Sequence, residues 1–339
     1  MSSLSFVSIA ALLTGAALCV TVPTVAHAGA PRVDGVFVNG VGPRPRAGFA
    51  TMSAFLFRKA WISLSDRTGA APWVPFDPEA LTHNPSLTWI GHASFLVRMD
   101  RVTFLTDPHF SERASPVSFA GPKRYQAPGI PLDSLPPIDF VVISHDHYDH
   151  MDLPSIEALA KRGTRFFVPL EMGALVREAG GEAVELDWWQ SARFGEIEIH
   201  CVPAQHFSGR SLTDEGRRLW AGFAVVGPTK RFYHAGDTGY FDGFAKVRER
   251  IGRIDMAALP IGAYDPPEIM QFVHMNPEEA AQAAVDVGAG TAVGMHFGTF
   301  DLTDEPLDEA PGRFQRAAMR SGLPVERAWV MKVGETRAW

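Results

Sequence analysis

One heptapeptide restricts the fold of this chain more than any other feature of its sequence: Ser144-His145-Asp146-His147-Tyr148-Asp149-His150. It follows directly on Asp139-Phe-Val-Val-Ile, a continuous apolar run of the kind that forms a strand buried on both faces. A loop at the end of such a strand can converge three imidazoles and two carboxylates on one point, whereas a helix spreads successive side chains around its axis. The heptapeptide therefore predicts a metal site at a strand end, and the alternative is a solvated loop of polar turn residues.

The rest of the chain supplies further ligands in the same kind of place. His206, Asp237 and His296 each follow a strand-like segment, at residues 197–204, 231–235 and 291–295. Two catalytic zinc ions, which keep a position for water, need about six or seven nitrogen and oxygen ligands from the protein. The chain offers that number in His145, His147, Asp149, His150, His206, Asp237 and His296. We therefore predict two Zn ions, with Mn or Fe as alternatives. Imidazole at position 147 favours zinc, because a carboxylate there would suit a di-iron redox centre.

Strands and helices are mixed along the main part of the chain. Short β-branched and aromatic runs predict strands at residues 88–97 and 102–106. Helices are expected at residues 153–162, 173–179 and 244–251, and Asn276-Pro277-Glu278-Glu279 opens another with an N-cap, a proline and a capping-box glutamate. This mixture without strict alternation indicates an α/β (α+β) fold in which outer helices cover the sheets.

The first 28 residues differ from the rest of the chain. They contain no Lys, Arg, Asp or Glu, carry an apolar stretch from Phe6 to Val20 and end in Ala26-His27-Ala28. That pattern is typical of a secretory signal peptide, and an uncleaved membrane anchor is the alternative. We expect an exported, periplasmic or membrane-associated protein, with a cytoplasmic location as the alternative. Cys201, which is left alone when Cys19 is removed, does not decide between them.

Residues 29–85 read as an N-terminal extension before a main domain at residues 86–339. The extension is rich in Gly, Pro and aromatic residues, which break regular structure. One helix is expected within it, because Ala50, Ala54, Phe57, Trp61 and Leu64 recur at helical spacing. The apolar face of this helix either packs on the main domain or contacts a membrane.

The pattern His-x-His-x-Asp-His at residues 145–150 resembles the signature of the metallo-β-lactamase superfamily. Further segments between about residues 87 and 300 resemble its branch of N-acylphosphatidylethanolamine-hydrolysing phospholipases D. These segments are Trp89-Ile-Gly-His-Ala-Ser, Leu105-Thr-Asp-Pro, Phe119-Ala-Gly-Pro-Lys-Arg-Tyr, His234-Ala-Gly-Asp-Thr-Gly-Tyr, Pro260-Ile-Gly-Ala-Tyr, His274-Met-Asn-Pro-Glu-Glu-Ala and His296-Phe-Gly-Thr-Phe. The resemblance implies an αββα sandwich with a hydrolase domain at residues 86–339.

The resemblance also implies a division of the ligands between two metal ions. His145, His147 and His206 would hold one zinc, Asp149, His150 and His296 would hold the other, and Asp237 would bridge them. The implied reaction is cleavage of the phosphodiester of N-acylphosphatidylethanolamine or a related glycerophospholipid by a metal-bridging hydroxide, with Asp149, Asp237 and His274 as the catalytic residues. His274 would orient a phosphoryl oxygen or protonate the leaving group, and the alternative is simple packing near a helix start.

The same hydroxide attacks carbonyl carbons, so a metal-dependent lactonase, β-lactamase or thioesterase is the alternative function. A β-lactamase of the common kind would usually carry Cys in place of Asp237, which counts against that activity. A binding protein without activity would be expected to show gaps among the seven ligands. None of the seven positions is missing.

Several neighbouring residues are expected to support the site. Asp107 either accepts the N–H of a ligand histidine or forms a turn before Pro108. His92 and His234 lie in strand-like segments and are expected to be hydrogen-bonded core histidines, not ligands. Asp146 is expected to shape the loop, and Cys201 to be a buried thiol in the core.

Charge restricts the partners. A net charge of −7 and a pI near 5.9 argue against nucleic acid, which calls for a basic surface. The expected partner is a phospholipid or small-molecule substrate, with peripheral membrane contact and a homodimer left open. Lys123 and Arg124 are candidates for binding an anionic substrate at the mouth of the pocket, and surface solvation is their alternative.

Overall fold

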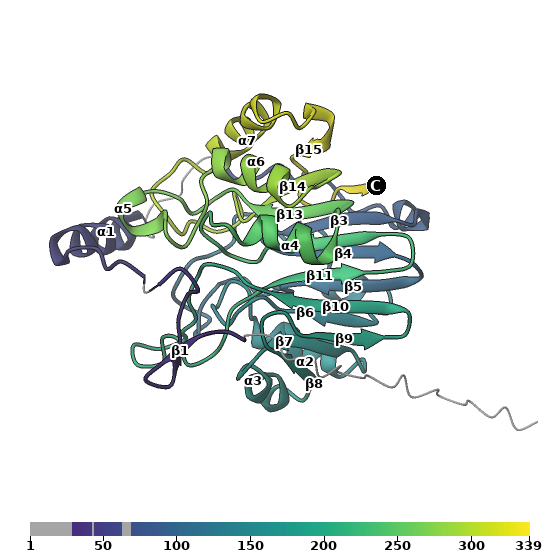
Figure 1. The fold of residues 1–339 in the computed structure, drawn as a ribbon, viewed down its shortest axis with the longest axis horizontal. Coiled ribbons are helices and arrows are strands. Elements are labelled where there is room, and N and C mark those ends of the chain that lie inside the picture. Colours follow the sequence, from purple (N-terminus) through teal and green to yellow (C-terminus); the bar gives the residue numbers. More distant parts are fainter. Residues whose placement is uncertain (1–28, 43, 63–68) are drawn as a thin grey trace, which may run out of the picture.

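The computed structural model describes residues 29–42, 44–62 and 69–339, and the predicted signal peptide at residues 1–28 lies outside these ranges. Two seven-stranded mixed sheets make up the centre of the molecule (Figure 1). No helix in the described ranges is both long enough and apolar enough to cross a membrane.

The first sheet takes its strands from the start of the main domain and one strand from the C-terminus. Its order is β16 (Thr336–Ala338), β3 (Ser86–Gly91), β4 (Ser94–Met99), β5 (Val102–Thr106), β6 (Phe140–Val142), β7 (Arg165–Pro169) and β8 (Glu182–Leu186). The strands β5 to β8 are parallel, so their carboxyl ends lie at the same edge. The prediction of one strand over residues 88–97 is wrong, because Gly91 and His92 have φ values of 127° and 53° and turn the chain between β3 and β4.

The second sheet contains the later part of the chain. Its order is β15 (Ala328–Trp329), β14 (Thr291–Met295), β13 (Met256–Pro260), β12 (Arg231–His234), β11 (Gly222–Val226), β10 (Ile197–Val202) and β9 (Ser191–Phe194). The strands β12 to β15 are parallel, and β9 to β12 are antiparallel. The predicted strands at residues 197–204, 231–235 and 291–295 are confirmed by β10, β12 and β14.

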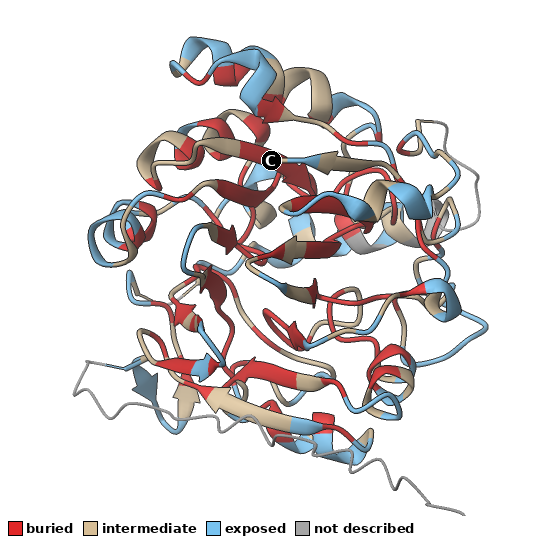
Figure 2. Ribbon diagram, turned by 90° about the vertical axis from the view of Figure 1, so that its right-hand side faces the viewer, coloured by how far each residue is buried: buried red, intermediate tan, exposed pale blue. Residues whose placement is uncertain are grey.

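The two faces of each sheet pack against different partners, because alternate side chains of a strand point to opposite faces. Trp89, Phe104 and Phe140 of the first sheet pack between the sheets with Ile199 and Phe223 of the second. The outer face of the first sheet packs on α2 (Leu153–Ala160) and α3 (Gly173–Glu178). The helices α4 (Gly243–Ile251), α6 (Pro277–Asp286) and α7 (Glu309–Arg320) cover the second sheet. Figure 2 shows the buried residues concentrated along the strands, and the predicted αββα arrangement is confirmed.

The predicted helices are confirmed with small shifts at their ends. The segments 153–162, 173–179 and 244–251 correspond to α2, α3 and α4. At the start of α6 the Glu279 backbone N–H donates to Asn276 Oδ1 at 2.9 Å, and the Asn276 N–H donates to Glu279 Oε2 at 3.0 Å. This reciprocal pair is the predicted capping box.

The segment predicted as an N-terminal extension, residues 29–85, packs on the rest of the chain in its described parts. It contains a hairpin of β1 (Arg32–Val33) and β2 (Val36–Phe37) and the helix α1 (Phe49–Ile62), which lies beside α5 (Pro267–Met270) at the left of Figure 1. Lys59 of α1 forms an ion pair with Asp301 at 2.7 Å. Phe57, from the predicted apolar face, is 73% exposed and does not pack on the rest of the chain. Leu64 of the same face lies outside the described residues.

Candidate metal centre

Loops that follow strands of both sheets meet at one edge of the sandwich. The heptapeptide 144–150 comes after β6 of the first sheet. His206, Asp237 and His296 come after β10, β12 and β14 of the second sheet. The side chains are therefore held from both sheets, and the structure brings all seven predicted ligands into one cluster.

Three ring nitrogens converge at one end of the cluster. Nε2 of His145 lies 2.9 Å from Nδ1 of His147, and Nε2 of His206 lies 3.2 Å from the same atom. His145 and His206 are buried, and His147 is partly exposed. Nitrogen atoms in this arrangement form a group that can hold a metal ion.

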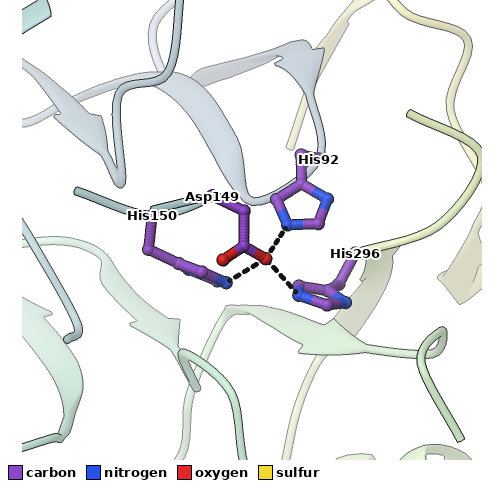
Figure 3. A group of neighbouring side chains, drawn as sticks. All are labelled: His92, Asp149, His150 and His296. Atoms are coloured by element: carbon purple, nitrogen blue, oxygen red, sulfur yellow. Dashed lines mark hydrogen bonds and ion pairs between the residues drawn. The ribbon is translucent and has the colours of Figure 1, made fainter. Parts of the chain in front are cut away.

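A second group surrounds the carboxylate of Asp149 (Figure 3). Its Oδ2 atom lies 3.5 Å from Nε2 of His150 and 3.3 Å from Nε2 of His296. Nε2 of His92 lies closer, at 2.9 Å from the same oxygen. Three imidazoles thus converge on one carboxylate, and together they form a second group that can hold a metal ion.

Asp237 lies between the two groups. Its Oδ2 atom is 3.1 Å from Nε2 of both His150 and His296. The same oxygen is 3.8 Å from Nε2 of both His145 and His206. This central position is what a bridging carboxylate requires.

The buried carboxylate of Asp107 fixes several of these rings from behind. It accepts hydrogen bonds from Nδ1 of His150 at 2.7 Å and from Nε2 of His234 at 2.8 Å. It also accepts the backbone N–H and the hydroxyl of Ser144, each at 2.7 Å. The expectations that Asp107 accepts a histidine N–H and that His234 is a hydrogen-bonded buried histidine are confirmed.

These supporting bonds determine which ring nitrogen faces the centre. His150 donates through Nδ1 to Asp107, and His206 donates through Nδ1 to the Val273 carbonyl at 2.9 Å. The Ser144 hydroxyl donates to Asp107, so it accepts from Nδ1 of His145 at 2.9 Å. When these three rings are neutral, the Nε2 lone pair of each therefore points into the cluster, as metal ligation requires.

The charges in the cluster fit a cation at its centre. A neutral His150 would direct its Nε2 lone pair at carboxylate oxygens of Asp237 and Asp149, and this repulsion is relieved only by a proton or a metal ion between them. Burial opposes a charge on His150, but Asp237 and Asp149 outweigh burial and raise its pKa. Burial alone would raise the pKa of Asp149 and Asp237, yet the neighbouring His150 holds both well below their usual range.

Buried atoms without partners support the same reading. Within the described ranges, Nε2 of His296, Nε2 of His150 and Oδ1 of Asp237 have no hydrogen-bond partner although they are buried. A buried polar atom without a partner costs about 1–3 kcal/mol. Divalent ions bound to these nitrogen and oxygen atoms would satisfy them, so the residues fit the predicted metal ions.

His274 lies at the rim of the cluster. Its ring centroid is 5.1 Å from that of His206, and its Nδ1 atom is 3.9 Å from Oδ2 of Asp237. Burial, with a contribution from His296, lowers the pKa of His274 to about 4 even though Asp237 acts in the opposite direction. A neutral ring at this place can donate one hydrogen bond toward the centre.

His92 is buried and hydrogen-bonded, as expected, but it lies in a turn beside the metal cluster and not in a strand. It occupies the turn between β3 and β4 with a φ of 53°, and its ring lies 4.0 Å from that of His296. Its backbone N–H donates to Thr299 Oγ1 at 2.8 Å, and its carbonyl accepts from Trp89 Nε1 at 2.9 Å. A left-handed backbone at a residue other than glycine persists only where the surroundings enforce it. A histidine directly after the glycine of a tight turn was the signal in the sequence that could have revealed it.

Other expectations near the centre have different outcomes. Asp146 accepts the Gly209 N–H at 2.7 Å and pairs with Arg218, so its loop-shaping role is confirmed. Cys201 is fully buried between the sheets, where burial raises the pKa of its thiol, as expected of a core residue.

Lys123 and Arg124, the two basic candidates for the pocket mouth, have different surroundings. Lys123 is exposed and pairs with Glu112 at 2.8 Å. Arg124 is buried and donates through Nη2 to the His109 carbonyl at 3.3 Å. Surface solvation, the alternative for both residues, is therefore wrong for Arg124, and its binding of an anionic substrate stays a prediction.

Known proteins are similar to this chain in sequence and in fold. Residues 102–297 match the beta-lactamase superfamily domain. An N-acyl-phosphatidylethanolamine-hydrolyzing phospholipase D of Caenorhabditis elegans is 43% identical over 228 residues, which cover 63% of this chain and 64% of the nematode protein. An uncharacterised protein of Mycobacterium tuberculosis is 41% identical over 298 residues, or 84% of this chain and 78% of that protein. The chain thus spans less than two thirds of the nematode relative.

A solved structure matches over most of the chain. A metallo hydrolase from the hyperthermophilic archaeon Ignicoccus hospitalis has a TM-score of 0.57 and 26% sequence identity. The match covers 74% of this chain and 97% of the archaeal chain. The similarity therefore extends over about three quarters of this chain and nearly the whole of the archaeal chain.

Proposed function

Because the chain belongs to the metallo-β-lactamase superfamily, we propose that it is a dizinc phosphodiesterase that cleaves N-acylphosphatidylethanolamine or a related glycerophospholipid. The observation that carries the proposal is the position of Asp237 between two groups of ring nitrogens. His145, His147 and His206 would hold one ion, Asp149, His150 and His296 the other, and Asp237 both. Imidazole and carboxylate ligands favour zinc, with Mn or Fe as alternatives.

The surroundings of His206 suit an anionic substrate with apolar parts. A cavity of about 250 Å³ reaches this residue and is lined by Phe37, Phe207, Arg44 and Arg46 among others. The Arg44 guanidinium stacks 4.0 Å above the ring of Phe207, and that ring contacts His147 edge-on at 4.5 Å. Glu215 also lines this cavity and pairs with Arg44 at 3.5 Å, so the cavity keeps one net positive charge. Aromatic walls and this charge favour a phospholipid over a neutral substrate.

The chain's residues would divide the work of hydrolysis. Two divalent ions held there would lower the pKa of water and stabilise the negative charge that develops at phosphorus. Asp107 and Ser144 keep the ligand rings in the orientation that this requires. His274 would donate a hydrogen bond to a phosphoryl or leaving-group oxygen, because its ring lies next to His206 and Asp237.

The proposal is tested by hydrolysis of N-acylphosphatidylethanolamine in mixed micelles by purified protein of known metal content. We expect two zinc ions per chain and metal-dependent release of N-acylethanolamine and phosphatidic acid. Asp149→Ala should abolish release and lower the metal content. Asp139→Ala is the matched control. The Asp139 carboxylate accepts the Thr103 N–H at a distance of 2.7 Å and does not belong to the cluster.

Parallel assays separate the proposed reaction from carbonyl hydrolysis. Bis-p-nitrophenyl phosphate reports phosphodiester cleavage without a lipid, and a chromogenic β-lactam, a lactone and a thioester report attack on a carbonyl. Turnover confined to the carbonyl substrates would replace the phosphodiesterase by a lactonase, β-lactamase or thioesterase. Metal-loaded protein that is inert on every substrate would contradict both functions.

A further inference from the structure

One side chain of the N-terminal extension holds the backbone of a predicted metal ligand. Nδ2 of Asn39 donates to the carbonyl of His206 at 2.9 Å, and the N–H of His206 donates to Oδ1 of Asn39 at 3.0 Å. Asn39 is 5% exposed, and His206 is fully buried. A side-chain amide thus pairs with both backbone groups of one residue, 167 positions away in the sequence.

Asn39 is itself held in place by main-chain contacts. The Phe37 N–H donates to the Gly216 carbonyl at 2.8 Å, and the Gly42 N–H donates to the Asn39 carbonyl at 3.0 Å. The first contact ties the hairpin of β1 and β2 to the loop after β10, and the second closes a turn around Asn39. The amide is therefore presented to His206 by an ordered segment and does not depend on a freely rotating side chain.

The amide pair completes the positioning of the His206 ring. His206 lies beyond the end of β10 at Val202, so the strand does not fix its backbone directly. The ring is oriented by the bond from Nδ1 to the Val273 carbonyl at 2.9 Å. Asn39 fixes the main chain and Val273 fixes the ring, and together they set the position of Nε2, which lies 3.2 Å from Nδ1 of His147.

We propose that Asn39 is a positioning residue of the metal centre, which makes residues 36–42 a working part of the active site. This inference rests on the metal centre of the proposed function, but not on its substrate. Residues 36–42 lie outside the 102–297 match to the superfamily domain. A side chain that positions a ligand typically changes metal affinity by about 10–100-fold when it is removed.

A purely structural role makes a different prediction. If Asn39 only anchors the extension, its loss lowers the melting temperature and leaves metal affinity unchanged. If Asn39 positions His206, its loss lowers the affinity for the ion held by His145, His147 and His206. The affinity for the other ion, held by Asp149, His150 and His296, is then unchanged. Metal affinity therefore distinguishes the two roles without any substrate.

The experiment compares Asn39→Ala and Asn39→Asp with the unchanged protein. Both metal ions are titrated against a chromophoric chelator, and the Co(II)-substituted protein is followed by its visible absorption. We expect Asn39→Ala to lower the binding affinity for one of the two ions about tenfold. Only the absorption of Co(II) at that position should change. Asn39→Asp keeps the size of the side chain and the acceptor for the His206 N–H, so it supplies a readout if Asn39→Ala fails to fold. Asn39→Asp should also lower the affinity for this ion, because the aspartate has no N–H to donate to the His206 carbonyl.

Asp187→Ala is the matched control. Asp187 Oδ1 accepts the Ala30 N–H at 2.9 Å, so this change loosens the same extension away from His206. We expect it to leave both metal affinities unchanged. Wild-type affinity for both ions in the Asn39 variants, or equal weakening in Asp187→Ala, would overturn the proposal. Failure of lipid hydrolysis alone would contradict the proposed substrate and leave this inference intact.

Discussion

Asp107 is the residue on which most of the orientation in the centre depends. Its one buried carboxylate accepts four hydrogen bonds, from the backbone and hydroxyl of Ser144, from His150 and from His234. Burial alone would raise its pKa, but His234 and His150 outweigh burial and keep it ionised. The carboxylate accepts only, and this fixes the proton of His150 on Nδ1.

Asp107→Asn should therefore weaken metal binding without removing a ligand. The amide NH2 group would face ring nitrogens that now donate, and His150 would have to move its proton to Nε2. We expect the affinity for the ion at His150 to fall about 10–100-fold, measured by metal content after dialysis against a chelator series. Asp139→Asn provides the control. Unchanged affinity would show that His150 keeps its orientation without an anionic acceptor.

The charge on His296 makes metal binding depend on pH. Burial disfavours the charged ring, but Asp237 and Asp149 outweigh burial and raise its pKa to about 9 in the metal-free protein. At pH 7 this ring therefore carries a proton that a metal ion must displace. Apparent metal affinity should therefore rise with pH below about 9, by about tenfold per unit for each proton released. Calorimetric titration in buffers of different ionisation enthalpy measures the release, and a heat independent of the buffer would contradict it.

Among the elements, those defined by local sequence could be predicted and those defined by distant contacts could not. The capping box of α6 spans four neighbouring residues, and the heptapeptide lies directly after β6, so each is visible as a pattern. The turn at His92 was missed because β3 and β4 read as one apolar run until Gly91 adopts its left-handed backbone. Nothing near Asn39 in the sequence indicates that it will meet His206, because only the folded chain brings them together.

The helix α6 offers a test of how much its cap contributes. Asn276→Ala removes the acceptor for the Glu279 N–H and leaves the start of the helix without its reciprocal bond. We expect the free energy of unfolding to fall by about 1 kcal/mol, measured by urea denaturation with an unchanged m-value. Gln282→Ala, on the exposed side of the same helix, is the control. A loss as small as in that control would show that packing on the second sheet alone maintains the helix.

At the scale of the whole molecule, the centre joins two halves that are otherwise separate sheets. The heptapeptide belongs to the first sheet, and His206, Asp237 and His296 belong to the second. Most of the contact between the two sheets is apolar packing. The cluster adds carboxylates and imidazoles at one edge of this interface. Without a cation between them, neutral rings of His150 and His296 would direct lone pairs at the carboxylate oxygens of Asp149 and Asp237, which lie 3.1 to 3.5 Å away, and this repulsion would destabilise the edge.

Metal removal should therefore lower the stability of the whole sandwich and not only of its loops. Ions that bind the folded chain alone add RT ln(1 + [L]/Kd), or about 2.7 kcal/mol per site when free metal is 100 times Kd. We expect the melting temperature in scanning calorimetry to fall on chelation and to rise again with free zinc. A double variant, His206→Ala with Asp149→Ala, should lose most of this metal-dependent shift, because each half then lacks a ligand. If two ions bind and the melting temperature does not change, the unfolded chain must bind them equally well, and the centre would contribute chemistry without linking the sheets.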